Sequence, residues 1–220
     1  MRAGDVIGGR YELVVLLGRG GMGEVWGGRD RVLRREVAVK LLHTGAGVSP
    51  ELPARFEREA VAAARISAPN VVAVYDGGAH EDLLYLVMER LGGGTLAGLI
   101  RDEAPMPAGR AVALAAQVCA ALCAAHAAGV VHYDIKPHNV MLAADQTVKV
   151  VDFGLAGFTQ TMLNLARSSQ LTPAGTPLYG APEQFGTTRG MSARTCTRSA
   201  RCCSRCSARS RRTPARTDTR

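Results

Sequence analysis

The chain has 220 residues, a formal net charge of +8 at pH 7 and a pI of about 9.6. A pI this high suggests contact with nucleic acid or anionic membranes only when the charge is spread over a folded surface. Here nine arginines and one acid, Asp218, lie in residues 191–220, and the remaining residues carry balanced charges. Composition therefore excludes a basic body, and we expect no specific nucleic-acid partner.

The cysteines and the first residues indicate the compartment. Two cysteines, Cys119 and Cys123, lie in the body, and the tail holds Cys196, Cys202, Cys203 and Cys206. The body thus has no disulfide framework, which suits a reducing cytoplasm. The opening "MRAGDVIGGRYELVVLL" carries charges where a signal peptide would be apolar. We expect a cytoplasmic protein.

The pattern of apolar residues changes in order along the chain. Residues 11–39 are β-branched and aliphatic with interspersed glycines, which predicts hairpin-linked antiparallel strands. Residues 49–67 have the periodic apolar side chains of one helix, and residues 70–91 contain two further short strands. After Gly92 to Gly94 the pattern becomes helical. We expect an α+β protein with an N-terminal extension at 1–10, a sheet-bearing part at 11–91, a helical part at 92–185 and a tail at 186–220.

Residues 111–131 form the longest apolar run and are long enough to cross a bilayer. The run is mostly alanine and includes Gln117 and His126, and Gly129 provides a C-terminal stop. This pattern predicts a buried core helix rather than a membrane segment.

The stretch "GRGGMGEV", residues 18–25, fits the pattern G-x-G-x-x-G-x-V. A glycine-rich turn lets backbone N–H groups approach phosphate oxygens that a side chain would block. Flexible turns show the same pattern, and a dinucleotide-binding fold would need a helix next. Here the strand-like "EVWGGRD" follows, which disfavours the dinucleotide alternative.

"VAVK", residues 37–40, places a lysine at the end of an apolar strand. Such a lysine is usually just solvated. Downstream of a glycine loop, however, Lys40 could reach phosphates held there and would then need a carboxylate to orient it. Glu59 is our candidate, with Glu57 as the alternative on another helix face, because residues two apart do not share a face.

Two later stretches put polar groups directly after apolar runs. "VVHYDIKPHNVML" (130–142) offers Asp134, Lys136 and Asn139, which could accept a hydroxyl proton, neutralise a phosphoryl oxygen and bind a divalent metal. "VVDFGLA" (150–156) adds Asp152, a second hard oxygen ligand of the kind Mg²⁺ requires.

These stretches, in this order and followed by "GTPLYGAPEQF" (175–185), resemble the signature set of eukaryotic-type protein kinases. The sequences "HYDIKPHN" and "GTPLYGAPEQ" are most similar to those of bacterial (Hanks-type) serine/threonine kinases. The resemblance runs from about Tyr11 to Gln184. Lys136 favours the Ser/Thr branch. The resemblance implies a bilobal kinase fold, with a complete N-terminal sheet lobe and an incomplete helical C-terminal lobe.

The resemblance also implies a role for each matching residue. Asp134, Lys136, Lys40 and Glu59 would be catalytic, with Lys40 paired to Glu59, and Asn139 and Asp152 would hold Mg²⁺, with Mn²⁺ as the alternative ion. Positions implied to bind ATP are Leu17, Gly18, Arg19, Gly20, Gly21, Met22, Gly23, Val25, Ala38, Lys40, Met88, Glu89, Leu91 and Met141. Among them, the resemblance implies that Val25, Ala38 and Met141 sandwich the adenine ring, that Met88 lies at the back of the pocket and that the backbone of Glu89 to Leu91 bonds the base edge. The implied function is phosphorylation of protein Ser/Thr hydroxyls. The alternative is an ATP-binding but catalytically impaired fragment or interaction module.

Two positions depart from the family pattern. Tyr133 stands where the family usually has an arginine that reads a phosphorylated activation loop, and tyrosine cannot make that bidentate contact. Activation through phosphorylation of Ser168, Ser169, Thr172 or Thr176 is therefore not expected. Gly180 replaces a larger apolar residue near the substrate site.

The sequence after Glu183 has lost its apolar periodicity and allows three interpretations. The tail cysteines could bind zinc, but they lack the paired C-x-x-C spacing. A basic tail could bind nucleic acid or anionic lipid. Thirdly, back-translation in a shifted frame admits Asp-Val-Arg-Ser-Asp-Leu-Tyr-Ala-Leu-Gly-Ala-Val-Leu-Phe-Glu-Met-Leu from residue 191 onward, which resembles the next helix of the kinase family. We expect a frameshift product, disordered because it cannot bury enough apolar surface.

Sequencing the gene is expected to show that one base inserted or deleted between about Gln184 and Met191 restores the kinase-like frame. The missing helices would cover the base of the loop at 132–139 and the buried side of the helix at 111–129, so we expect exposed apolar surface there, low stability and a tendency to aggregate. The repaired protein should then be the soluble, active form. A stop codon in the shifted frame, or a frame encoding nothing like Leu-Tyr-Ala-Leu-Gly, contradicts this expectation and favours the basic tail.

Overall fold

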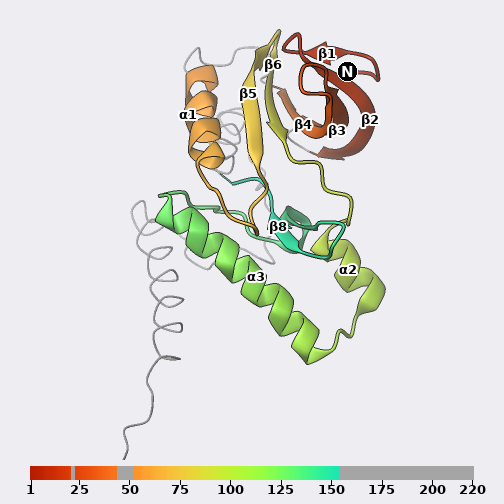
Figure 1. Cartoon of the computed structure of the whole chain (residues 1–220), viewed down its shortest axis with the longest axis vertical. Coiled ribbons are helices and arrows are strands. Elements are labelled where there is room, and N and C mark those ends of the chain that lie inside the picture. Colours follow the sequence, from red (N-terminus) through yellow and green to blue (C-terminus); the bar gives the residue numbers. More distant parts are fainter. Residues whose placement is uncertain (21–22, 44–51, 154–220) are drawn as a thin grey trace, which may run out of the picture. The chain divides into compact units, whose positions relative to one another are not determined.

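The computed structural model describes residues 1–20, 23–43 and 52–153 (Figure 1). The chain divides into two compact units, residues 1–175 and 176–220. All of the second unit lies outside the described residues. The predictions for the activation segment, Gly180 and the tail therefore have no structural counterpart and remain predictions.

A six-stranded antiparallel sheet forms the first part of the described chain, in the order β1-β2-β3-β4-β6-β5. Its strands are β1 (Val6–Ile7), β2 (Tyr11–Gly20), β3 (Gly23–Asp30), β4 (Arg35–His43), β5 (Val74–His80) and β6 (Leu83–Met88). The predicted hairpin-linked strands are thus confirmed. Residues 1–10, expected as an extension, contribute the edge strand β1, which pairs with β2.

The two faces of this sheet are buried in different ways. Helix α1 (Leu52–Ala64), the predicted helix, packs Phe56 and Ala60 into the cluster that holds Ala38 and Leu42 of β4. The opposite face belongs to another cluster, which is formed by Val37, Val39 and Leu41 of β4 together with Ile7, Tyr11, Leu13, Trp26, Leu83, Tyr85 and Val87. Because successive side chains of a strand point to opposite faces, Lys40 lies on the face that α1 covers.

Asp30, at the end of β3, is completely buried and gathers four hydrogen bonds. Arg10 donates two to its carboxylate, at 2.9 and 2.7 Å, and the amides of Val32 and Leu33 each donate one at 3.1 Å. These bonds, led by the one from Arg10, lower the pKa of Asp30 to about 2. The carboxylate thereby ties the start of β2 to the turn between β3 and β4.

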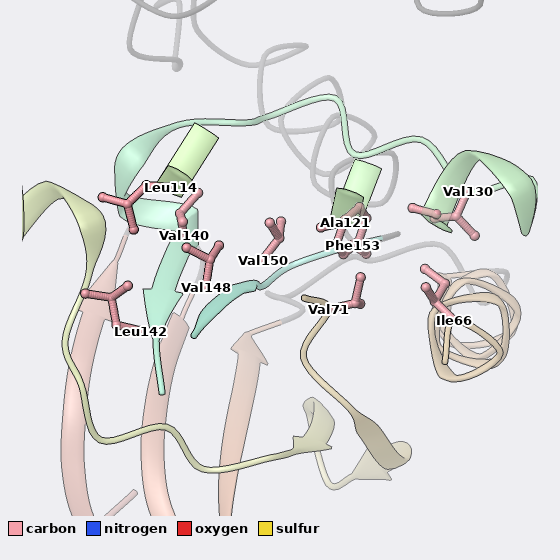
Figure 2. Close-up of a cluster of buried hydrophobic side chains, with 11 residues drawn as sticks. Ile66, Val71, Leu114, Ala121, Val130, Val140, Leu142, Val148, Val150 and Phe153 are labelled. Carbon is pink, nitrogen blue, oxygen red and sulfur yellow. The ribbon is translucent and has the colours of Figure 1, made fainter. Parts of the chain in front are cut away.

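The second part of the described chain contains α2 (Leu96–Glu103), α3 (Ala108–Ala127), the short 3₁₀ helix η1 (Pro137–Asn139), β7 (Val140–Leu142) and β8 (Val148–Val150). Thr95 caps α2, because its hydroxyl accepts a hydrogen bond from the amide of Gly98 at 3.1 Å. Figure 2 shows the core between these elements, where Leu114 and Ala121 of α3 lie near the aliphatic side chains of β7 and β8. The hairpin of β7 and β8 is therefore packed against α3.

Helix α3 confirms the predicted helix but not its predicted burial. Three of its side chains, Leu114, Ala121 and Ala125, are buried, whereas Val112 is 68% exposed. The prediction of a buried core helix is therefore wrong for most of its length, because β8 and its neighbours cover only one narrow stripe of the helix. The expectation that an incomplete C-terminal lobe leaves apolar surface of this helix exposed is confirmed. Within the described residues, α3 is also the one helix apolar and long enough to span a membrane, and core helices of soluble proteins share both features.

Candidate active site

The predicted glycine loop is the turn between β2 and β3, where Gly20 lies opposite Gly23. Residues 21–22, which include the predicted Gly21 and Met22, lie outside the described residues. Gly23 has a φ of +143°, and a Cβ there would lie 1.9 Å from the carbonyl oxygen of Leu41, so glycine is required by the fold itself. A Cβ on Gly18 or Gly20 would meet no atom within 4 Å. The protein's own packing does not require glycine at these two positions, whereas close approach of a ligand would.

Polar side chains link the two strands, β2 and β3, on either side of this turn. Arg19 pairs with Glu24 across the strands at 3.0 Å, and Trp26 donates to the same carboxylate at 2.8 Å. Leu17, another predicted ATP-binding residue, is 48% exposed. Val25 is the cross-strand neighbour of Lys40, which places the turn directly beside the predicted phosphate-binding lysine.

Lys40 and Asp152 are joined across the two parts of the described chain. The Lys40 ammonium lies 2.7 Å from Oδ1 of Asp152, and the two side chains are 16% and 27% exposed. Asp152 follows β8 and has a φ of +67°, in the left-handed region that aspartate tolerates better than most residues. The structure thus brings the predicted phosphate-binding lysine to the predicted metal ligand.

The expected ion pair between Lys40 and Glu59 is not formed in the described structure. Lys40 contacts Asp152 instead, and Glu59 bonds Arg55 one helical turn earlier, at 3.3 Å. Glu57, the alternative partner, is exposed, whereas Glu59 is half-buried on α1. The burial pattern therefore favours Glu59 over Glu57 as the carboxylate that faces the sheet.

Asp134, Lys136 and Asn139 form one hydrogen-bonded group. The Lys136 ammonium donates to Oδ2 of Asp134 at 2.7 Å, and the amide nitrogen of Asn139 donates to the same oxygen at 3.1 Å and to the Asp134 carbonyl at 2.8 Å. No contact among the described residues is recorded for Oδ1 of Asp134, whose side chain is 53% exposed. The group presents one oriented carboxylate oxygen to the outside.

The buried side chain of His132 holds the loop that carries Asp134. This role was not predicted from the sequence. Its Nε2 lies 2.8 Å from the carbonyl of Val151, and its Nδ1 lies 3.3 Å from the amide nitrogen of Asp134. A carbonyl only accepts, so Nε2 carries a proton. The amide of Asp134 donates mainly to the His132 carbonyl, at 2.8 Å, and its longer contact with Nδ1 suits an unprotonated Nδ1. Burial lowers the pKa of His132, which agrees with a neutral ring. His132 thus couples the loop of Asp134 to the strand that leads into Asp152.

The two predicted metal ligands fit a hard divalent cation. The backbone carbonyl of Asn139 accepts a hydrogen bond from the amide of Val151 at 3.0 Å, so Asn139 lies beside the residue that precedes Asp152. Because the Asn139 amide nitrogen is used on Asp134, its oxygen faces elsewhere, and Asp152 has a second carboxylate oxygen besides the one on Lys40. Mg²⁺ is usually bound by one or two protein oxygen ligands, with water and phosphate oxygens completing its coordination, and these two residues match that preference. Within the described residues no cluster of three or more His, Cys, Asp or Glu offers a metal cage.

The predicted adenine-binding residues lie together. Ala38 and Met88 are buried in the cluster beneath α1, they are cross-strand neighbours, and Leu91 and Met141 pack against that cluster. The amide of Glu89 already donates to the carbonyl of Ala73 at 2.9 Å. The other backbone groups of Glu89 to Leu91 remain the ones that the family resemblance assigns to the base edge.

Comparison with known proteins agrees with this geometry. The protein kinase domain family model matches residues 11–196. The serine/threonine-protein kinase PknB of Mycobacterium leprae is 41% identical over 179 residues, which are 80% of this chain and 28% of that protein. PknE of Mycobacterium bovis is 41% identical over 178 residues, 80% of this chain and 31% of that protein.

Solved structures are also similar. The crystal structure of the Mycobacterium tuberculosis PknI kinase domain aligns with a TM-score of 0.63 and 32% identity, over 70% of this chain and 63% of that one. The chain spans less than a third of the length of the two curated relatives named above. The resemblance to bacterial serine/threonine kinases is confirmed, and the chain belongs to the protein kinase family.

Proposed function

We propose that this chain binds ATP with a divalent cation, Mg²⁺ or alternatively Mn²⁺, and transfers the γ-phosphoryl group to a serine or threonine hydroxyl of a protein substrate. The observation that carries the proposal is the hydrogen-bonded group of Asp134, Lys136 and Asn139 next to the Lys40–Asp152 pair. Since ATP and a reducing environment occur together in the cytoplasm, we place the activity there.

Asp134 orients the substrate hydroxyl and accepts its proton. Lys136 and Asn139 hold Oδ2, which leaves Oδ1 for the incoming O–H. The hydroxyl oxygen forms a bond to the γ-phosphorus, the bond from that phosphorus to the β,γ-bridging oxygen breaks, and the bridging oxygen leaves with ADP. The exposed carboxylate is accessible to a hydroxyl on another protein.

The lysines supply positive charge at the phosphates. Lys136, fixed on Asp134 at 2.7 Å, stabilises the transferring group, and Lys40 binds the α- and β-phosphates. Pre-oriented charges of this kind account for much of the rate enhancement in enzymes. The divalent cation, held by Asn139 and Asp152, supplies further charge neutralisation at the phosphate oxygens.

The test is autophosphorylation of the purified chain with Mg²⁺-ATP beside its Asp134→Asn variant. We expect the variant to lose about 100-fold or more in rate, because an amide accepts no proton from the hydroxyl. Asp145→Asn is the matched control, since Asp145 is an exposed turn residue bonded to the amide of Thr147. Equal rates in the Asp134→Asn variant and wild type would contradict the role of Asp134. ATP binding without phosphotransfer would favour the alternative, a nucleotide-binding module.

A further inference from the structure

Lys149 and Glu89 form an ion pair that none of the proposed roles uses. The Lys149 ammonium, at the centre of β8, lies 2.9 Å from Oε2 of Glu89, just after the end of β6. The same oxygen accepts a hydrogen bond from the amide of Ala73 at 3.3 Å. The two side chains are only 16% and 26% exposed, so the pair is better shielded than a typical surface ion pair.

The register of the small hairpin places Lys149 beside the adenine site. Lys149 is the direct cross-strand partner of Met141 in β7. Side chains of directly paired residues lie on the same face of a sheet. Met141 packs against the cluster of Ala38 and Met88. The aliphatic part of the Lys149 side chain therefore lies beside Met141 at the predicted adenine site, and its ammonium reaches Glu89 at the end of β6.

The strand that carries Lys149, β8, is held in place by hydrogen bonds on both sides of Lys149. Asn70 donates from its side chain to the Val148 carbonyl at 2.9 Å, and the Gln117 side chain accepts from the Val148 amide at 2.9 Å and from Asn70 at 3.1 Å. The amide of Val150 bonds the carbonyl of Asn70 at 2.9 Å. Both neighbours of Lys149 in the strand are therefore anchored, so Lys149 holds Glu89 against a well-bonded strand.

We propose that Lys149 is a positioning residue for the adenine end of the nucleotide. By pairing with Glu89, Lys149 sets the distance between the backbone of residues 89–91, which follow β6, and Met141 of β7 on the other side of the predicted adenine site. The inference rests on the proposed function, because it requires that adenine binds there. Lys149 itself touches neither phosphates nor the reacting hydroxyl.

Binding of ATP and of adenosine to the whole chain separates this role from a phosphate role. Lys149→Met keeps the apolar stem and removes the charge, and we expect it to weaken both ligands by the same factor, roughly fivefold. Lys40→Met should weaken ATP alone, because adenosine has no phosphate. Lys149→Arg should restore most of the affinity. Arg101→Met removes an exposed 2.8 Å pair with Asp102 on α2 and should change neither affinity.

A double-mutant cycle with Lys149→Met and Glu89→Gln, measured by urea unfolding, tests the link without nucleotide. We expect the unfolding constants to be coupled by about threefold or more. Unchanged or tighter adenosine binding in Lys149→Met, a loss confined to ATP, or absent coupling would each overturn the inference and leave the proposed function standing. Wild-type chain that binds neither ligand would overturn the proposed function and this inference together.

Discussion

Lys40→Met and Asp152→Asn are each expected to lower phosphotransfer by about 100-fold or more. Lys40 lies near the glycine turn because it is the cross-strand partner of Val25, and Asp152 is one of the two proposed oxygen ligands for the divalent cation. Removing either leaves transition-state charge uncompensated. The initial rate of phosphate transfer to a serine-rich protein substrate, at saturating Mg²⁺-ATP, measures the effect.

Both substitutions should leave the fold intact. Methionine retains the stem of Lys40, and asparagine tolerates the φ of +67° at position 152. Asp145→Asn and Arg101→Met, at exposed positions away from the site, serve as controls with unchanged rates. A rate within twofold of wild type in either active-site variant would refute the role assigned to that residue.

Asp30→Ala is expected to lower the free energy of unfolding by about 3 kcal/mol at pH 7. The carboxylate is fully buried, and its loss leaves the Arg10 guanidinium and the amides of Val32 and Leu33 without their acceptor. Urea unfolding measures the change. Glu36→Ala is the contrast, because Glu36 is 76% exposed in its pair with Arg90 and should contribute less than about 1 kcal/mol. Equal costs for the two variants would contradict the account of Asp30.

The same carboxylate predicts a pH dependence with a definite sign. Its pKa in the folded protein is about 2, below the ordinary value of 3.8. A depressed folded pKa stabilises the protein above the unfolded pKa, and the contribution is lost as the pH falls from about 4 towards 2. Asp30→Asn cannot titrate, so its unfolding free energy should vary less over that range. An identical pH profile in wild type and variant would show that Asp30 is not the group responsible.

Several elements could be derived from the sequence because short-range spacing determines them. The apolar run from Val37 to Val39, followed by Lys40, predicted a strand downstream of the glycine turn, and β4 confirms that strand. The periodicity of residues 49–67 likewise predicted α1. Residue contacts at i+2 in strands and at i+3 and i+4 in helices are set locally, so pattern alone reveals them.

Only the tertiary structure decided which distant partners meet. Nothing in the local pattern around Lys40 distinguishes Asp152 from Glu59 as its partner, because the outcome depends on how β8 docks onto residues 70–72 and aims the chain that follows it. Nothing in the local sequence links Lys149 to Glu89, because the two residues are sixty positions apart and meet only in the fold. The exposure of α3 is likewise a result of packing, since an apolar helix is buried only where another element covers it.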